Sequence, residues 1–340
     1  MMRKVCTLFV AIMLPLFFQS HAFAALPLTL SQTLQLPGEV KGHFDHLAID
    51  IKGHRLFTTP EDYKSVIVFD YVTGKIVHNI KGIGMPHAVL YREDVDRIFV
   101  TDGDPGAVRI FDGKTYNLLK SIKLLAHTDS ITYDPASKFL YIVTGGKQAQ
   151  QEVSRIDIVD TTSESSIGDI EIEGDALEAL TLETRTTKLY VNNTSKNRVD
   201  VIDRDKKMLI ASWPITLAQN NTSLALDEAN HRLFVGCRSG TLVVFDTSTG
   251  KEVQSLPMTK GVDDMVFDSA SRRIYASCGD GPGFVEVYEE ADPGHIHPLA
   301  QIPSGPMGKT SLLSSALHRY FVSVPQHEDK NAVVLIYDVN

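Results

Sequence analysis

The sequence predicts an all-β fold: a seven-bladed β-propeller with four-stranded antiparallel blades, in which an N-terminal strand closes the last blade. Three observations lead to this prediction. One unit recurs seven times, each unit holds four strand-like segments, and the seventh unit ends before its fourth segment. A period of about 40 to 50 residues built from short strands is typical of propeller blades.

The repeat is clearest in a β-branched, alternating segment that ends in an acidic residue. It occurs at residues 66–70, 108–112, 156–160, 199–203, 242–246, 285–289 and 334–338. Successive closing acids lie 42 to 49 residues apart. A second strand-like segment precedes each of these, as in His54–Phe57 and Arg272–Tyr275. Turn residues such as Asp134–Ser137 separate the segments, so each unit supplies an inner, a second, a third and an outer strand.

The two ends of the chain predict how the ring closes. The seventh unit stops at Asn340 after its third strand, and the segment Leu30–Leu36 has the pattern of an outer strand. We expect this segment to pair with Val333–Tyr337, because an unpaired edge strand favours aggregation. The pairing is predicted to bury alternate leucines of the segment, namely Leu30, Leu34 and Leu36.

The N-terminus has the three parts of a secretory signal peptide. Arg3 and Lys4 precede the apolar run Val5–Phe18, and Ala22–Ala24 forms a small-residue cleavage site. The run is 14 residues long, whereas a membrane-spanning helix needs roughly 20. We therefore expect residues 1–24 to be a signal peptide and residues 25–340 to be a single propeller domain. The mature protein is expected to be periplasmic or secreted, monomeric and without a membrane span.

The charge of the chain argues against nucleic acid as a partner. The formal net charge is −9, and removal of Arg3 and Lys4 makes it −11. Binding to nucleic acid requires clustered Lys and Arg that displace counterions from phosphates, and the sequence has no such cluster. The same reasoning disfavours an anionic membrane surface.

The units resemble a known family of propellers. Lys188–Asn193 followed by Val199–Asp203, and Leu242–Asp246 followed by Thr247–Lys251, are similar to the YVTN-repeat, YncE-like propellers of bacterial periplasms. The similarity covers essentially the whole mature chain. It implies the propeller fold and the periplasmic compartment. Such propellers serve binding, lyase, lactonase and redox roles, so the resemblance leaves the activity open.

Antiparallel geometry predicts which residues share the channel mouth, because inner strands begin where second strands end. Aligned units give a first ring at His43, Met85, His127, Ala176, Asn220, Gly261 and Met307. They give a second ring at Asp45, His87, Asp129, Glu178, Thr222, Asp263 and Lys309. A third ring, at the ends of the second strands, consists of Pro60, Asp102, Thr144, Asn193, Cys237, Cys278 and Val324.

Every member of the second ring is polar, which has two interpretations. Propeller channels are wet, so the polar residues could simply contact solvent. Alternatively the ring binds a ligand, a small molecule or a periplasmic protein, and the residues predicted to do so are Asp45, His46, His87, Asp129, Glu178 and Asp263. Four histidines on the same rim are candidate metal ligands: His43, His46, His87 and His127.

Three functions follow from this mouth. The first is a binding module without chemistry. The second is a metal-dependent, lactonase-like hydrolase, in which oxygen ligands hold Ca²⁺ or Mg²⁺; the candidates are Asp45, Glu178, Asn220 and Asp263. The third is a copper redox site, built from His43, His87, His127, Met85 and Met307. The sequence has no nucleophile elbow, P-loop or Rossmann glycine pattern, so whether the protein is an enzyme stays open.

Two cysteines remain in the mature chain. Cys237 and Cys278 occupy the same ring position in adjacent blades. A disulfide requires Cα atoms within about 7 Å, which neighbouring second strands seldom reach. Free thiols, a disulfide and metal ligation are the three alternatives.

Overall fold

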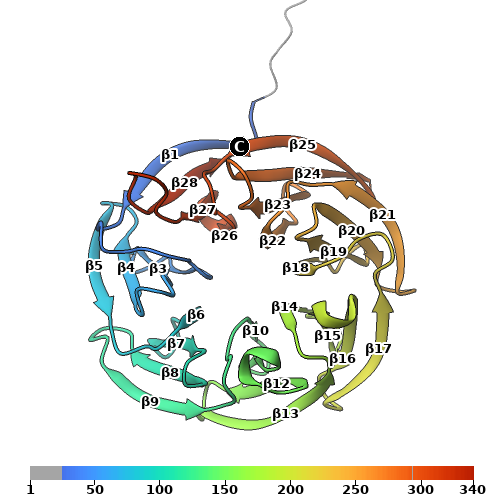
Figure 1. Cartoon of the computed structure of the whole chain (residues 1–340), viewed down its shortest axis with the longest axis horizontal. Coiled ribbons are helices and arrows are strands. Elements are labelled where there is room, and N and C mark those ends of the chain that lie inside the picture. Colours follow the sequence, from blue (N-terminus) through green and yellow to red (C-terminus); the bar gives the residue numbers. More distant parts are fainter. Residues whose placement is uncertain (1–24, 293) are drawn as a thin grey trace, which may run out of the picture.

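The computed structural model describes residues 25–292 and 294–340, so the predicted signal peptide lies outside the described residues. Within this part of the chain, 28 strands form seven four-stranded antiparallel sheets. Figure 1 shows the sheets arranged as a ring, each with its first strand toward the central axis. The predicted seven-bladed propeller is confirmed.

Blades 1 to 4 each consist of four consecutive strands. Blade 1 contains β2 (Ala48–Asp50), β3 (Arg55–Thr58), β4 (Val66–Asp70) and β5 (Lys75–Ile80). Blade 2 contains β6 (Pro86–Arg92), β7 (Arg97–Asp102), β8 (Ala107–Asp112) and β9 (Leu118–Lys123). Blade 3 contains β10 (Ile131–Asp134), β11 (Phe139–Gly145), β12 (Val153–Asp160) and β13 (Ser165–Glu173). Blade 4 contains β14 (Leu177–Leu182), β15 (Lys188–Asn193), β16 (Arg198–Asp203) and β17 (Met208–Pro214).

Blade 7 differs from the others because its outer strand comes from the start of the chain. Blade 5 contains β18 (Asn221–Asp227), β19 (Arg232–Cys237), β20 (Thr241–Asp246) and β21 (Lys251–Pro257). Blade 6 contains β22 (Val262–Asp268), β23 (Arg273–Cys278), β24 (Phe284–Asp292) and β25 (His295–Pro303). Blade 7 contains β26 (Thr310–Ser314), β27 (Arg319–Val324), β28 (Val333–Val339) and β1 (Leu28–Gln35). Three short 3₁₀ turns, η1 (Lys147–Ala149), η2 (Thr194–Lys196) and η3 (Ser315–Leu317), lie in loops.

The acid that closes each repeat has a local structural role in several blades. Asp70 accepts hydrogen bonds from the backbone N–H groups of Val72 and Thr73 at 2.9 Å. Asp246 accepts the equivalent bonds from Ser248 and Thr249. An aspartate that accepts bonds from the residues following it forms an Asx turn. The acid therefore ends the third strand and starts the hairpin to the outer strand, which explains its recurrence in the sequence.

The core of the described ring is divided among the blade interfaces. Seven hydrophobic clusters are present, and each joins two adjacent blades. Between blades 1 and 2, for example, Phe57 of β3 packs in one cluster with Ile98 of β7. Since the second and third strands are buried on both faces, they are nearly continuous apolar segments, as in Val66–Phe69. The apolar packing thus holds the blades in fixed positions around the axis.

The predicted closure is confirmed, with one correction. β1 pairs with β28 in an antiparallel register that runs from Leu28 opposite Val339 to Gln35 opposite Val333. Leu34 and Leu36 are buried as predicted, but Leu30 is 52% exposed. The prediction for Leu30 was wrong because the register shifts between Leu30 and Gln32. A bulge of this kind interrupts the alternation of side chains between the two faces.

The two cysteines are free and buried. Each sits at the end of a second strand, Cys237 in β19 and Cys278 in β23. Burial raises the pKa of both thiols, which disfavours the thiolate that a metal or an electrophile needs.

Candidate functional site

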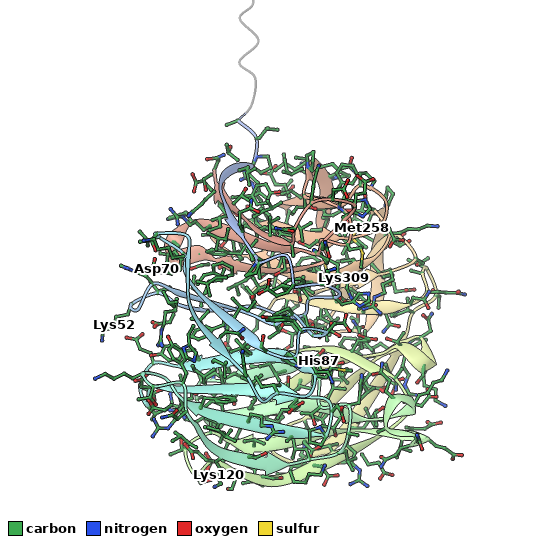
Figure 2. All side chains as sticks on the ribbon, turned by 60° about the vertical axis from the view of Figure 1, so that its left-hand side comes forward. Lys52, Asp70, His87, Lys120, Met258 and Lys309 are labelled. Carbon is green, nitrogen blue, oxygen red and sulfur yellow. The ribbon has the colours of Figure 1, made fainter. Side chains whose placement is uncertain are left out.

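All seven members of the second ring line one cavity at the mouth of the channel, with a volume of about 300 Å³. Four of them lie in inner strands: His87, Glu178, Thr222 and Asp263. The other three, Asp45, Asp129 and Lys309, come just before the inner strands of their blades. The six residues predicted from the sequence to bind a ligand are all among the lining residues. Figure 2 shows His87 and Lys309 within the body of the ring, whereas Lys52 and Lys120 project from its outside.

The third ring does not face the mouth. Its members are buried, and Asp102, Asn193, Cys237 and Cys278 have no exposed surface. Asp102, for instance, accepts hydrogen bonds from the N–H groups of Gly84 and Met85 and pairs with Arg109 at 2.9 Å. These residues stabilise the blades and the loops between them, so the prediction that they surround the mouth was wrong.

Two of the residues that directly follow third-ring members face the cavity instead. Glu61 comes directly after Pro60, and Arg238 comes directly after Cys237; both line the cavity. Alignment of the strand ends does not predict them, because each lies one residue beyond the third-ring member of its blade. The sequence contains one indication of their role, because both are charged residues at the same position of different repeats.

The four histidines proposed as metal ligands do not all lie together. His46, His87 and His127 line the cavity, but His43 does not. The side chain of His43 is 57% exposed and lies 3.4 Å from the Asp62 carboxylate. The oxygen set proposed for a lactonase-like site is also divided, because Asn220 is exposed and is not among the lining residues.

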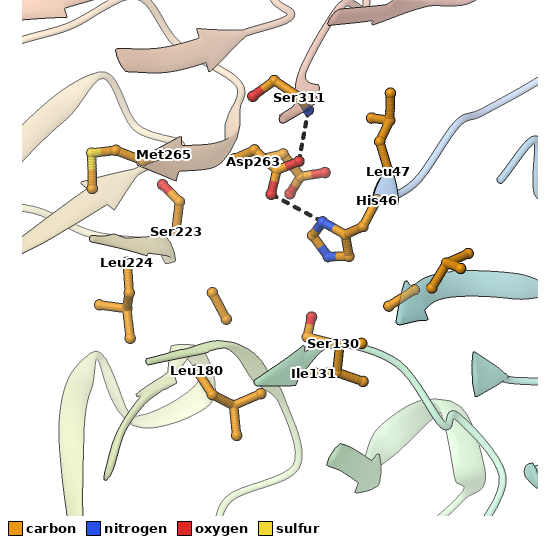
Figure 3. Close-up of a pocket in the computed structure, with 14 residues that line it drawn as sticks. His46, Leu47, Ser130, Ile131, Leu180, Ser223, Leu224, Asp263, Met265 and Ser311 are labelled. Carbon is orange, nitrogen blue, oxygen red and sulfur yellow. Dashed lines mark hydrogen bonds and ion pairs between the residues drawn. The ribbon is translucent and has the colours of Figure 1, made fainter. Parts of the chain in front are cut away.

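A row of alternating imidazoles and carboxylates crosses one side of the mouth, from blade 6 to blade 3. At its beginning, His46 Nδ1 lies 2.9 Å from Asp264 Oδ1. A dashed line from the labelled His46 ring marks this ion pair in Figure 3. His46 Nε2 lies 3.3 Å from Asp45 Oδ1, and His87 Nδ1 donates to Asp45 Oδ2 at 2.6 Å. The row continues through Asp129 to His127. His87 Nδ1 lies 3.6 Å from Asp129 Oδ1, and His127 Nε2 lies 3.2 Å from Asp129 Oδ2.

Contact with these carboxylates changes the pKa values of the imidazoles. Burial would lower the pKa of His87, but Asp129 and Asp45 raise it to about 10. Burial would also lower the pKa of His46, but Asp264 and Asp45 raise it well above its usual value. Burial would likewise raise the pKa of Asp45, but His46 and His87 hold it well below its usual range. His127 is different: burial lowers its pKa, although Asp129 opposes the change.

The opposite side of the mouth carries the basic side chains. Lys309 Nζ lies 2.7 Å from Asp263 Oδ2, and Arg238 donates to the other oxygen of the same carboxylate. Arg238 Nη1 also lies 3.7 Å from Glu178 Oε1. Burial is the main cause that raises the pKa of Glu178 to about 7, against the effect of Arg238. Burial and the charge of Asp45 raise the pKa of Glu61 to about 7 as well.

Below the mouth, the channel continues into a second cavity of about 250 Å³. His46, Ser130, Ala179 and Asp263 line both cavities. The lower lining adds apolar side chains, among them Leu180, Leu224 and Met265. The polar mouth therefore leads to a less polar channel, and the boundary between them lies at His46.

Gly103 provides the space in which His87 sits. A Cβ atom at Gly103 would lie 2.6 Å from His87 Nε2. The glycine N–H donates to the Met85 carbonyl, and its own carbonyl accepts from the His127 N–H, both at 2.9 Å. This glycine therefore connects three residues of the first and second rings.

We expect Gly103→Ala to destabilise the protein by about 1–3 kcal/mol, as overpacking of a filled site does. The reason is that the His87 ring is held by Asp45 and cannot move away without breaking that hydrogen bond. Thermal unfolding monitored by circular dichroism measures the effect. Gly38→Ala is the control, because its Cβ would meet its nearest neighbour, the Asn331 side chain, at 3.4 Å. Equal melting temperatures for the two variants would contradict the prediction.

Comparison with known proteins supports the propeller and a YncE-like relationship. No family model matches the chain. The YncE proteins of Salmonella typhi and Salmonella typhimurium are 32% and 31% identical to it over 109 residues, and neither has an assigned function. These matches span 32% of this chain and 31% of each relative. The chain is a propeller that resembles the YncE proteins in sequence over about a third of its own length and about a third of theirs.

Solved structures show similarity in fold alone. The structure of U3-55K aligns with a TM-score of 0.73 at 13% identity, covering 90% of this chain and 97% of the other. Kuenenia stuttgartiensis hydrazine synthase aligns with a TM-score of 0.74 at 15% identity, covering 88% and 97%. The RRP9 WD40 repeats align with a TM-score of 0.76 at 12% identity, covering 91% and 99%. Among the described residues, no helix is long and apolar enough to cross a membrane.

Proposed function

We propose that the protein is an exported, periplasmic or secreted binding module that holds a small polar ligand with a cationic group at the channel mouth. The observation that carries the proposal is the convergence of Asp45, His46, His87, Asp129, Glu178 and Asp263 on a single polar cavity. Small-molecule sites are typically concave and contain a few convergent polar groups with perturbed pKa values.

The preference for a cation follows from the two glutamates. Arg238 and Lys309 both pair with Asp263, and the imidazoles contact Asp45, Asp129 and Asp264. Among the described residues, no hydrogen bond reaches the carboxylate of Glu61 or Glu178. A half-buried carboxylate without a hydrogen bond costs free energy, and Arg238 approaches Glu178 only to 3.7 Å. A ligand ammonium group would supply the missing donor. The raised pKa values of both glutamates are consistent with carboxylates that lack a hydrogen-bond donor.

Three ligands of equal chain length test the charge preference. Putrescine is a dication, 1,4-butanediol is neutral and succinate is a dianion. We expect calorimetry on EDTA-treated protein to detect putrescine binding and to detect neither of the others. Glu178→Gln should weaken putrescine binding by about tenfold or more, because a hydrogen bond to a charged group contributes roughly 1.5–3 kcal/mol.

Glu93→Gln is the matched control for this measurement. Glu93 is exposed, pairs with Lys52 at 3.5 Å and is not among the residues that line the mouth. The same affinity in Glu178→Gln and Glu93→Gln, or a preference for succinate, would contradict the proposed binding mode.

A metal-dependent propeller enzyme is the second candidate. The specific observation in its favour is the approach of His87 to two carboxylates, Asp45 and Asp129. Such an enzyme would use a bound divalent cation, Ca²⁺ or Mg²⁺ in a lactonase-like hydrolase or copper in a redox protein, to activate water or to polarise a substrate.

A further inference from the structure

We propose that the channel mouth contains a site for a divalent transition-metal cation of the Zn²⁺ class, with Asp45 Oδ2, His87 Nδ1 and Asp129 Oδ1 as ligands. This site goes beyond the binding of an organic cation, because it uses the acids on the opposite side of the mouth from Arg238 and Lys309. It differs from the four-histidine set proposed from the sequence and shares only His87 with it.

The three side chains already have the spacing of a metal centre. One ligand atom from each lies within 4.8 Å of the others. His87 Nδ1 is 2.6 Å from Asp45 Oδ2 and 3.6 Å from Asp129 Oδ1. Ligands that bind Zn²⁺ at about 2.0–2.2 Å lie roughly 3.3 Å apart in a tetrahedron. Shifts of less than about 1 Å would therefore bring both distances to the values of a bound site.

The ligands are held by the frame of the propeller. They come from the inner strands of blades 1, 2 and 3 or from the residues just before them. The Asp45 N–H donates to the Thr59 carbonyl and the Asp129 N–H donates to the Val143 carbonyl, both at 3.0 Å. The side chains are only 13%, 7% and 15% exposed for Asp45, His87 and Asp129. A site on rigid strands loses little entropy when it binds.

The orientation of His87 directs its metal-binding nitrogen toward the cavity. Its other nitrogen, Nε2, is buried against Gly103 and has no hydrogen-bond partner among the described residues. All polar contacts of the ring are therefore made by Nδ1. Binding of the metal at Nδ1 displaces the proton that this nitrogen donates to Asp45, and the proton is released to solvent.

Each of the two ligand carboxylates also contacts a neighbouring imidazole through its second oxygen. His46 Nε2 lies 3.3 Å from the second oxygen of Asp45, and His127 Nε2 lies 3.2 Å from the second oxygen of Asp129. Outer partners of this kind orient metal ligands. Three protein ligands also leave the cavity side of the metal open, as in zinc sites that accept a water or a substrate.

The donor set favours a transition metal over Ca²⁺. Imidazole with carboxylates suits Zn²⁺ and its neighbours, whereas Ca²⁺ takes about six to eight oxygen ligands. Asp263, the third aspartate of the second ring, supplies no further oxygen, because it is already paired with Arg238 and Lys309.

Titration of the EDTA-treated, full mature protein with ZnCl₂ in a calorimeter tests the site. We expect one Zn²⁺ per chain. Asp129→Asn should weaken binding at least about 100-fold, since even the loss of an outer partner costs about 10- to 100-fold. Asp104→Asn is the matched control: it removes an exposed carboxylate that is not among the residues lining the mouth, and its effect should stay below about tenfold. Co²⁺ provides a second probe, whose visible absorption should appear in the wild type and be lost in Asp129→Asn.

Two results would overturn the proposal: no Zn²⁺ binding by the folded wild type, or equal losses in Asp129→Asn and Asp104→Asn. If Asp129→Asn fails to fold by circular dichroism, Asp45→Asn carries the same expectation. The putrescine measurement is made without metal and the zinc measurement without organic ligand. Failure of one proposal is therefore distinguishable from failure of the other.

Discussion

Deleting residues 25–36 is expected to remove most of the free energy that keeps the ring folded. The deleted segment contains β1 together with Leu36, and it buries three leucines, Leu28, Leu34 and Leu36, almost completely. Burial of each leucine contributes about 1.5–3 kcal/mol, so their loss amounts to roughly 5–9 kcal/mol. The stability of a typical domain is only about 5–15 kcal/mol. Urea unfolding of the full and the shortened mature proteins measures the difference.

Two point substitutions distinguish the effect of leucine burial from the effect of shortening the chain. Leu34→Ala should cost about 2–5 kcal/mol because it leaves a cavity in a packed core. Leu30→Ala, on the same strand but half-exposed beyond the bulge, should change stability by less than about 0.5 kcal/mol. If the shortened chain unfolds at the urea concentration of the full chain, β1 does not close the ring. Equal costs at the two leucines would contradict the register of the bulge.

The free energy of unfolding is expected to fall between pH 6.5 and pH 10, because the pKa values of His87 and His46 are both raised. The pKa of His87 is raised from 6.5 to about 10 by Asp129 and Asp45, against the effect of burial. A raised pKa in the folded state stabilises the protein fully below the unfolded value of 6.5, and this stabilisation is lost as the pH rises through 10. The change is of the order of 5 kcal/mol at most, at about 1.4 kcal/mol per pH unit. Glu61 and Glu178 change stability in the same direction near pH 7, because their pKa values are also raised.

His87→Gln tests this pH dependence through its slope. The variant should show a smaller loss of stability between pH 7 and pH 10, whatever its stability at pH 7. His231→Gln is the control, because His231 is exposed in the turn between β18 and β19, at the end of the blade away from the mouth. Chemical unfolding at both pH values gives the slopes. A His87→Gln slope equal to that of the wild type would show that the pair with Asp45 does not hold its proton into the alkaline range.

The blades could be predicted because each repeat carries local chemistry. The acid that ends each third strand is a turn residue as well as a sequence marker, so Asp70 and Asp246 indicated strand ends directly. The bulge in β1 could not be predicted in this way. It depends on which register of β1 packs best against β28, and these strands are joined only in the folded ring. Leu30 was therefore assigned to the wrong face.

The site was predictable only where the strands themselves position the side chains. The second ring follows from the alignment of inner strands, and all its members reach the mouth. Glu61 and Arg238 lie in loops, whose direction a strand pattern does not determine. The pairing of His87 with Asp45 was equally hidden, because the two residues are 42 positions apart and meet only across adjacent blades.

The bond between the ends of the ring has a consequence for how the protein is made. Ser31 Oγ donates to the Ile336 carbonyl across 305 positions of the chain, and closing a loop of that length costs about 5 kcal/mol in chain entropy. A ribosome adding about 5–20 residues per second needs on the order of 15 to 60 s to make the chain between them. For that time the leucines of β1 have no partner strand. We expect a nascent chain to need protection of this segment until β28 has been synthesised, so closure of blade 7 is the last step of folding.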